Sequence, residues 1–178
     1  MKRLAAASGA AVLISALCLS GCGSSNNYGV SVQLEKICGV VDTVCTNNPE
    51  LSLATGEPLI GRISVWNLMS DTSGAGADSG LAVNLTSVEI DYRTPYGNPL
   101  PQRREQIAYT IDPISDKKNG VDFPVVLFGY EQIEYFKDNS GLFPELPFQV
   151  NMHVTVHYTT SGAAKGDVQG VFSMELVY

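Results

Sequence analysis

His153 and His157 are the only histidines of this 178-residue chain, so a catalytic triad or a histidine-based zinc site would have to use them. They lie in "NMHVTVHY", where polar and apolar residues alternate as in a half-buried β-strand. Two side chains four residues apart share one strand face but stand about 13 Å apart, at ~3.3 Å per residue. Because zinc binds histidine nitrogens at about 2.1 Å, the pair predicts no metal site. We expect both to be exposed polar residues. The opposite, apolar face of this strand consists of Met152, Val154, Val156 and Tyr158.

Carboxylates are the second source of chemistry. Glycosidases use two carboxylates about 5–9 Å apart, so an acidic segment is a candidate for glycan hydrolysis. Asp71 and Asp78 lie in "SDTSGAGADSG", which offers oxygen ligands for calcium but lacks the alternating acids of an EF-hand loop, so no metal site is predicted there. No Gly-x-Ser-x-Gly elbow or Walker loop occurs in the sequence. The acids concentrated in one segment are Glu131, Glu134, Asp138 and Glu145.

Aromatic residues near turns form the third group. Rigid aromatic rings often serve as binding contacts, and loops often carry binding residues, although core packing explains such rings equally well. The candidates for a binding surface are Tyr92, Tyr96, Tyr130 and Tyr135, with Phe136 beside them.

The N-terminal segment determines where we expect the protein to act. Lys2 and Arg3 precede an uncharged stretch that is too short for a membrane span and typical of a secretory signal. The residues Leu19-Ser20-Gly21-Cys22 that follow resemble the lipobox of bacterial lipoproteins. This resemblance implies that residues 1–21 are removed as a signal peptide and that Cys22, acylated with palmitate among its chains, becomes the mature N-terminus. The alternative is an ordinary secretory signal in which Cys22 is incidental.

The residue after the lipobox cysteine is Gly23, where lipoproteins of the inner membrane often carry Asp. The resemblance therefore implies an outer-membrane protein that faces the periplasm or the cell surface. Several acyl chains, each contributing about 0.8 kcal/mol per buried CH₂, would hold the domain at the membrane. Residues 22–28 are mostly polar and predict a short lipidated tether between the lipid and the fold.

The mature chain is acidic. Removing residues 1–21 takes away two of the 11 basic residues and none of the 18 acidic ones, which leaves a net charge of −9. Such a chain gains nothing from counterion release, so we expect no nucleic-acid partner. Its length predicts one domain, over residues 29–178.

Cys38 and Cys45, in "CGVVDTVC", remain after removal of Cys18 and acylation of Cys22. Since exported proteins meet an oxidising environment, we expect these two cysteines to form a structural disulfide. A redox-active pair is the alternative, but it would favour the Cys-x-x-Cys spacing, which is absent here.

The elements that must position these residues are strands. Period-2 alternation recurs in seven segments, and the gaps between them are rich in Gly, Pro, Asp, Asn and Ser. This pattern predicts an all-β fold, a single β-sandwich of about seven strands. A short helix is expected near residues 130–138. The seven segments are "GVSVQLEKI", "LIGRISVWNLM", "LTSVEIDYRT", "EQIAYTID", "VDFPVVLFG", residues 151–158 and residues 171–178.

Several of these segments resemble fibronectin type III and immunoglobulin-like domains. In "VEIDYR", residues Val88, Ile90 and Tyr92 match the pattern of the third strand, and Trp66 lies where the second strand keeps a core tryptophan. "LFPELPFQVNM" resembles the entry to the sixth strand, with Leu146 and Phe148 in place of the usual Thr and Tyr. The resemblance covers about residues 58–178 and implies a sandwich of this class.

These observations lead to three functional hypotheses. The first is a non-enzymatic envelope lipoprotein that acts in binding, adhesion or assembly, held at the membrane by its lipid and contacting an envelope protein partner. The second is an envelope glycan hydrolase that uses the carboxylates of residues 131–145. The third is a periplasmic carrier of a small ligand. We expect no cofactor.

Overall fold

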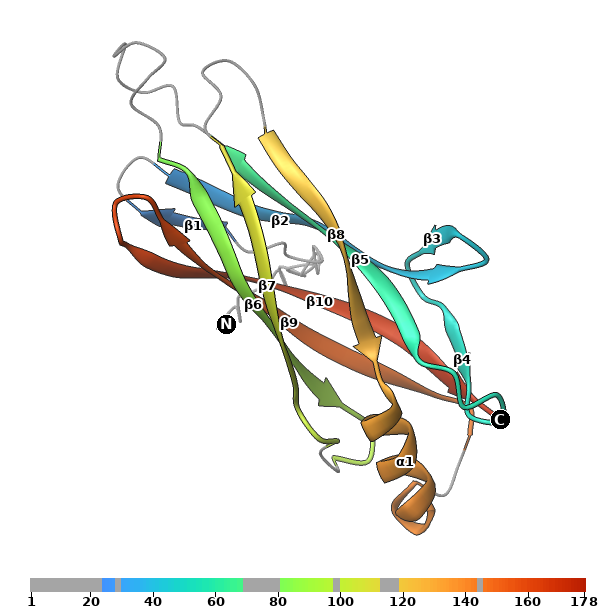
Figure 1. Cartoon of the computed structure of the whole chain (residues 1–178). Coiled ribbons are helices and arrows are strands. Elements are labelled where there is room, and N and C mark those ends of the chain that lie inside the picture. Colours follow the sequence, from blue (N-terminus) through green and yellow to red (C-terminus); the bar gives the residue numbers. More distant parts are fainter. Residues whose placement is uncertain (1–23, 28–29, 69–80, 98–99, 113–118, 144–145) are drawn as a thin grey trace, which may run out of the picture.

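The computed structural model describes residues 24–27, 30–68, 81–97, 100–112, 119–143 and 146–178 (Figure 1). Within these ranges the chain forms ten strands, one α-helix and one 3₁₀-helix. In chain order they are β1 (Ser24–Asn27), β2 (Val30–Val41), β3 (Val44–Thr46), β4 (Glu50–Ser52), β5 (Leu59–Leu68), β6 (Val83–Arg93), β7 (Arg103–Ile111), β8 (Asn119–Phe128), α1 (Tyr130–Asp138), η1 (Ser140–Leu142), β9 (Phe148–Thr160) and β10 (Lys165–Val177).

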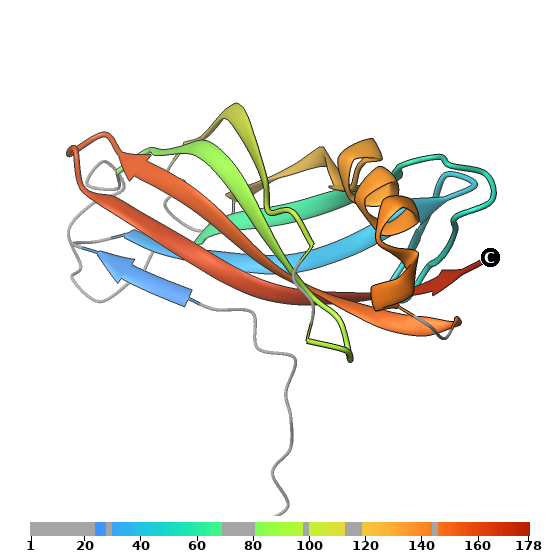
Figure 2. The same cartoon turned by 90° about the horizontal axis from the view of Figure 1, so that it is seen from below.

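The strands form two five-stranded sheets that pack face to face, as Figures 1 and 2 show. The first sheet has the order β1-β2-β5-β8, and β3 pairs with β2 beside this path. The second sheet has the order β4-β10-β9-β6-β7, in which all neighbours are antiparallel except β4 and β10. The architecture is therefore an all-β sandwich, as the strand pattern predicts.

The seven predicted strands are confirmed as β2, β5, β6, β7, β8, β9 and β10. The predicted number of about seven is nevertheless too low, because β1, β3 and β4 were not predicted. These three strands have only three or four residues each. A segment of that length is too short to show a period of two.

The core lies between the inner faces of the two sheets. Along β9, Met152, Val154 and Val156 are fully buried, while the residues between them are only partly buried. Val125 and Leu127 of β8 are buried in the same way in the first sheet. The two inner faces therefore build the core from alternate residues of each long strand.

The segments that resemble fibronectin type III strands lie in or at the start of β5, β6 and β9. When the three short strands are set aside, these are the second, third and sixth strands in chain order. One expectation from the resemblance is wrong: Trp66 is not a core residue. Alternation along β5 places Ile63 and Val65 inside, so Trp66 faces outward and covers Gly120 of β8, where an added Cβ would lie 2.5 Å from the indole ring.

The predicted helix is confirmed as α1, which lies at the end of the sandwich where β8 ends and β9 begins (Figure 1). Ile133 and Phe136 are its buried apolar residues, and Phe136 stacks on Phe143 at 4.6 Å between ring centroids. Gln132 is fully buried: its Oε1 accepts a hydrogen bond from the Gly129 amide at 3.0 Å, and its Nε2 donates to the Pro101 carbonyl at 2.9 Å. The side chain of Gln132 therefore ties the start of the helix to the chain before β7.

The predicted disulfide between Cys38 and Cys45 is present, with 5.4 Å between the two Cα atoms. It joins β2 to β3, in a hairpin whose turn residues Asp42 and Thr43 both have positive φ angles. The bond closes a loop of short sequence separation, so its stabilisation should lie in the lower part of the usual ~2–4 kcal/mol.

We predict that Cys38→Ser combined with Cys45→Ser lowers the melting temperature by about 4–8 °C, since about 2 kcal/mol is lost and each kcal/mol shifts Tm by ~2–4 °C in a domain of this size. Thermal unfolding followed by circular dichroism measures the shift. The intact mass of the unreduced wild-type protein provides the control, because oxidation removes two hydrogens. Alkylation of both cysteines without reductant would contradict the disulfide.

The predicted tether of residues 22–28 differs from the structure in one respect. Residues Ser24–Asn27 form β1, which pairs with the start of β2 from Ser24 opposite Gln33 to Asn27 opposite Val30. The polar composition of this segment suggests a linker, but a neighbouring strand edge supplies backbone partners that composition does not reveal. The signal peptide and Cys22 lie outside the described residues.

Candidate functional site

The outward face of the β10-β9-β6-β7 sheet holds a group of polar side chains that includes both histidines. On β9 the inward positions are apolar, and period 2 places His153, Thr155 and His157 outward. The prediction that both histidines lie on the outward face of this strand is therefore confirmed. Both are half-buried, however, rather than substantially exposed. The reason is that each has neighbours on both flanking strands: Val171 and Asp91 flank His153, and Asp167 and Ser87 flank His157.

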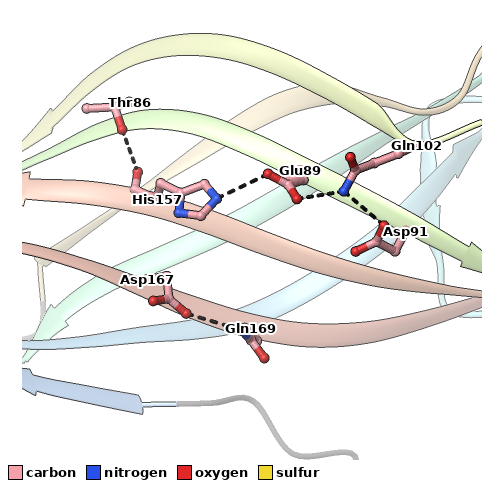
Figure 3. A network of polar contacts seen from close by, with 7 residues as sticks. All are labelled: Thr86, Glu89, Asp91, Gln102, His157, Asp167 and Gln169. Carbon is pink, nitrogen blue, oxygen red and sulfur yellow. Dashed lines mark hydrogen bonds and ion pairs between the residues drawn. The ribbon is translucent and has the colours of Figure 1, made fainter.

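His157 belongs to a group of interacting side chains that Figure 3 shows. Its Nε2 lies 3.6 Å from Glu89 Oε2. The other oxygen of Glu89, Oε1, accepts a hydrogen bond of 2.6 Å from Gln102 Nε2, which also donates to Asp91 Oδ1 at 2.9 Å. One amide thus bridges two carboxylates, and one of these carboxylates contacts the imidazole. We call these four residues the Glu89 network.

Two further contacts lie beside the Glu89 network (Figure 3). Thr86 Oγ1 donates a hydrogen bond to the backbone carbonyl of His157 at 3.2 Å, and Gln169 Nε2 donates to Asp167 Oδ2 at 3.2 Å. Thr86 lies where the register between β6 and β9 shifts, between the pairs Leu85–Tyr158 and Ser87–His157. This bulge sets the positions of the Glu89 network, because every outward residue of β6 after it is displaced by one place along β9.

The side chains of the Glu89 network remain accessible at the surface, with 36% of His157 and 29% of Glu89 exposed. They offer carboxylate acceptors on a rigid sheet, while the Nε2 atom of His157 is covered from solvent. The described residues contain no group of three or more His, Cys, Asp or Glu side chains arranged to hold a metal ion. The arrangement is suited to hydrogen bonds and ion pairs with a partner that carries donor groups.

Ser87 lies opposite His157 and could suggest a nucleophile. It is only 3% exposed, and the hydrogen bonds of the described residues include none between Ser87 and His157. An activated serine needs a hydroxyl within hydrogen-bond reach of its base and open to substrate. This pair does not have that arrangement.

The carboxylates proposed for glycan hydrolysis lie at the helix end of the sandwich. Glu131, Glu134 and Asp138 are all on α1, and all three are exposed. Glu145 lies outside the described residues, as do Asp71 and Asp78 of the loop considered for calcium. The structure therefore places three of the four candidate acids on the solvated surface of one helix.

The four tyrosines chosen as surface contacts have different environments. Tyr130 is 63% exposed and is the one that fits the role. Tyr96 and Tyr135 are half-buried, and the ring of Tyr96 packs edge-on against Phe148 at 5.2 Å. Tyr92 is a core residue, and its assignment to a binding surface is wrong, because it lies on the inward face of β6 and is only 5% exposed.

Tyr92 has a buried hydroxyl that donates a hydrogen bond to the Leu127 carbonyl at 2.8 Å. Its ring also packs edge-on against Phe128 at 5.5 Å. Burial raises the pKa of the Tyr92 hydroxyl well above its usual value near 10, against the opposing effect of the Arg103 charge. Tyr92 therefore links the two sheets and stays protonated where exposed tyrosines ionise.

We predict that Tyr92→Phe lowers the free energy of unfolding by about 1–2 kcal/mol at neutral pH, since the buried Leu127 carbonyl loses its partner. The raised pKa adds a pH dependence of known sign. Above about pH 10 a tyrosine of the unfolded chain loses its proton while Tyr92 in the folded chain keeps it, so wild-type stability falls as pH rises. Denaturant titrations at pH 8 and pH 11 should show a smaller fall for Tyr92→Phe. If the free energy of unfolding falls equally in both proteins between pH 8 and pH 11, Tyr92 does not cause the pH dependence.

Comparison with known proteins gives few matches. No family model and no curated protein matches the chain. A crystal structure of a protein from Archaeoglobus fulgidus is similar, with 10% identity and a TM-score of 0.45 over 82% of this chain and 97% of that one. The X-ray structure of Northeast Structural Genomics Consortium target SoR45 has 10% identity and a TM-score of 0.41 over 84% of this chain and 88% of that one.

Sequence reasoning did not identify Glu89, Asp91 or Gln102 as site residues. The alternation in "VEIDYR" does place Glu89 and Asp91 on one face of a strand, so the sequence indicates that these two carboxylates lie near each other. Their meeting with His157 depends on which strands are neighbours and in which register.

No helix among the described residues is long and apolar enough to cross a membrane.

Proposed function

We propose that this protein is a lipid-anchored, non-enzymatic module of the bacterial outer membrane that binds a protein partner in adhesion or in assembly of an envelope complex. The outward face of β10-β9-β6-β7 is its contact surface. The lipobox resemblance supports the location, and the Glu89 network is the observation that supports binding at this face.

The chemistry of this face suggests the kind of partner. Glu89 and Asp91 on β6, and Asp167 on β10, are carboxylates on two strands of a rigid sheet, with β9 between these strands. Hydrogen bonds from Gln102 hold two of them in place before any partner arrives, which reduces the entropy lost on binding. A protein surface with Lys or Arg side chains is the complementary partner.

The exposed positions of Glu131, Glu134 and Asp138 favour this proposal over glycan hydrolysis. A general acid in a glycosidase has a raised pKa because its carboxyl group is shielded from water. Exposed carboxylates on one helix face are better suited to keeping the surface soluble.

We predict that a pull-down from detergent-solubilised envelope recovers a protein partner with the wild-type chain. The double variant Glu89→Gln with Asp91→Asn should recover at least about fivefold less, a loss of roughly 1 kcal/mol or more. Asp122→Asn is the matched control, because Asp122 is exposed on β8 of the other sheet and its charge change should leave recovery unchanged.

Two outcomes would contradict this proposal. If the wild-type chain recovers no partner above background, the protein is not a binding module of this kind. If the double variant recovers as much partner as the wild type, the contact surface lies elsewhere.

A further inference from the structure

We infer that the side of the sandwich formed by β1 and β10 lies against the lipid surface, so that the long axis of the domain runs parallel to the membrane. This inference rests on the proposed lipid anchor at Cys22. It concerns how the anchored domain is oriented, and the partner is the lipid surface itself.

The position of β1 is the first observation. β1 extends the first sheet beyond β2, on the side where β10 is the neighbouring strand of the second sheet, and Figures 1 and 2 both show β1 beside β10. The pairing of Ser24 with Gln33 fixes where the chain enters the fold. On the side where the N-terminal segment joins the domain, β1 of the first sheet therefore lies next to β10 of the second.

The chain enters this side beside the body of β10 and not at either of its ends. Ser24 is opposite Gln33, and the next residue of β2, Leu34, packs against Gly170 of β10, where an added Cβ would lie 3.1 Å from its Cδ2. Gly170 is close to the centre of β10, which has 13 residues. At ~3.3 Å per residue, Lys165 at the start of β10 lies about 17 Å from Gly170, and Val177 at its end lies about 23 Å away.

The connection to the lipid is much shorter than either distance. Cys22 precedes Ser24 by two residues, which span at most about 7 Å when fully extended. A domain standing on either end would hold Gly170 about 17–23 Å from the lipid, beyond the reach of this connection. While β1 stays paired with β2, the domain must lie along the membrane.

This orientation has a consequence for the two ends of one cross-strand row. Gln169 of β10, Thr155 of β9, Glu89 of β6 and Arg104 of β7 lie opposite one another in the register. Gln169 and Arg104 therefore have the same position along the long axis of the domain. Across the sheet they are three strand spacings apart, about 14 Å. With β10 against the lipid, Gln169 is close to the membrane and Arg104 is farther away, which leaves the Glu89 network open to a partner from the side.

The test places one fluorophore at each end of this row. The full lipidated chain is produced as Gln169→Cys or Arg104→Cys, and both positions are exposed. Removal of Cys18 with the signal peptide, acylation of Cys22 and the Cys38–Cys45 disulfide leave the new thiol as the only free one. The labelled proteins are inserted into phosphatidylcholine vesicles that contain a lipid with a headgroup quencher. We expect at least about threefold stronger quenching at position 169. Equal quenching at both positions would overturn the orientation.

A second variant isolates the short connection as the cause. Ten Gly and Ser residues inserted between Gly23 and Ser24 add a flexible chain with an average span of about 17 Å, so the two positions should then be quenched nearly equally. If the full difference persists, the short connection does not set the orientation and the inference is wrong.

Flotation of the vesicles separates this inference from the proposed function. If the labelled proteins do not float with the vesicles, the lipid anchor itself is absent and the proposed function is wrong. If they float and the two labels are quenched equally, the anchor is present and only the orientation is wrong.

Discussion

The Cys22→Ala protein is expected to incorporate no labelled palmitate when it is produced in a bacterial host, because no other cysteine follows the lipobox residues Leu19, Ser20 and Gly21. The resemblance to lipoproteins implies that processing acts on the acylated cysteine. The variant should therefore stay uncleaved or be released from the membrane. Radioactive or alkyne-tagged palmitate followed by gel electrophoresis measures the loss, and fractionation of the envelope shows where the protein is.

Cys18→Ala is the matched control for this experiment. Cys18 lies in the segment that is removed with the signal peptide, so its substitution should leave palmitate at the wild-type level. Label at the wild-type level in Cys22→Ala would end the lipoprotein interpretation, together with the orientation that depends on it.

Met152→Ala is expected to lower the free energy of unfolding by about 2–5 kcal/mol, which is the usual result of truncating a fully buried methionine. Met152 has no exposed surface and lies on the inward face of β9, a central strand paired with both β6 and β10. The cavity left by the shorter side chain is surrounded by strands that cannot easily close it. Urea titration measures the change as a shift of the midpoint at constant slope.

His153→Ala is the control for this substitution, since His153 is the next residue and faces outward. We expect a loss below about 1 kcal/mol, because a half-buried polar side chain outside the core removes little apolar contact. Equal losses in both variants would mean that β9 is buried on both faces or is shifted by one residue. A His153→Ala protein of unchanged stability that fails to recover the partner would extend the contact surface to His153.

The sequence by itself was sufficient to predict the long strands, the short helix and the disulfide. In β9, for example, the apolar Met152, Val154 and Val156 alternate with polar neighbours, and this pattern follows from the local geometry of a strand. The same argument places His153 and His157 on the outward face. The pairing of Cys38 with Cys45 was predicted on the expectation that Cys18 is removed and Cys22 acylated, and the structure contains this disulfide.

The tertiary structure alone decided what lies beside these strands. Glu89 lies on β6, Gln102 directly precedes β7, and His157 lies on β9. They meet because β6 pairs with both β7 and β9 and carries a bulge at Thr86. Trp66 was expected in the core and faces outward, whereas Tyr92 was expected at the surface and is buried. In both cases the opposite sheet determines which face of the strand points inward. The strand β1 exists because the edge of β2 supplies backbone partners to a polar segment. Local periodicity is a property of neighbouring residues, whereas strand order, register and edge pairing depend on contacts between distant segments, which no short stretch of sequence contains.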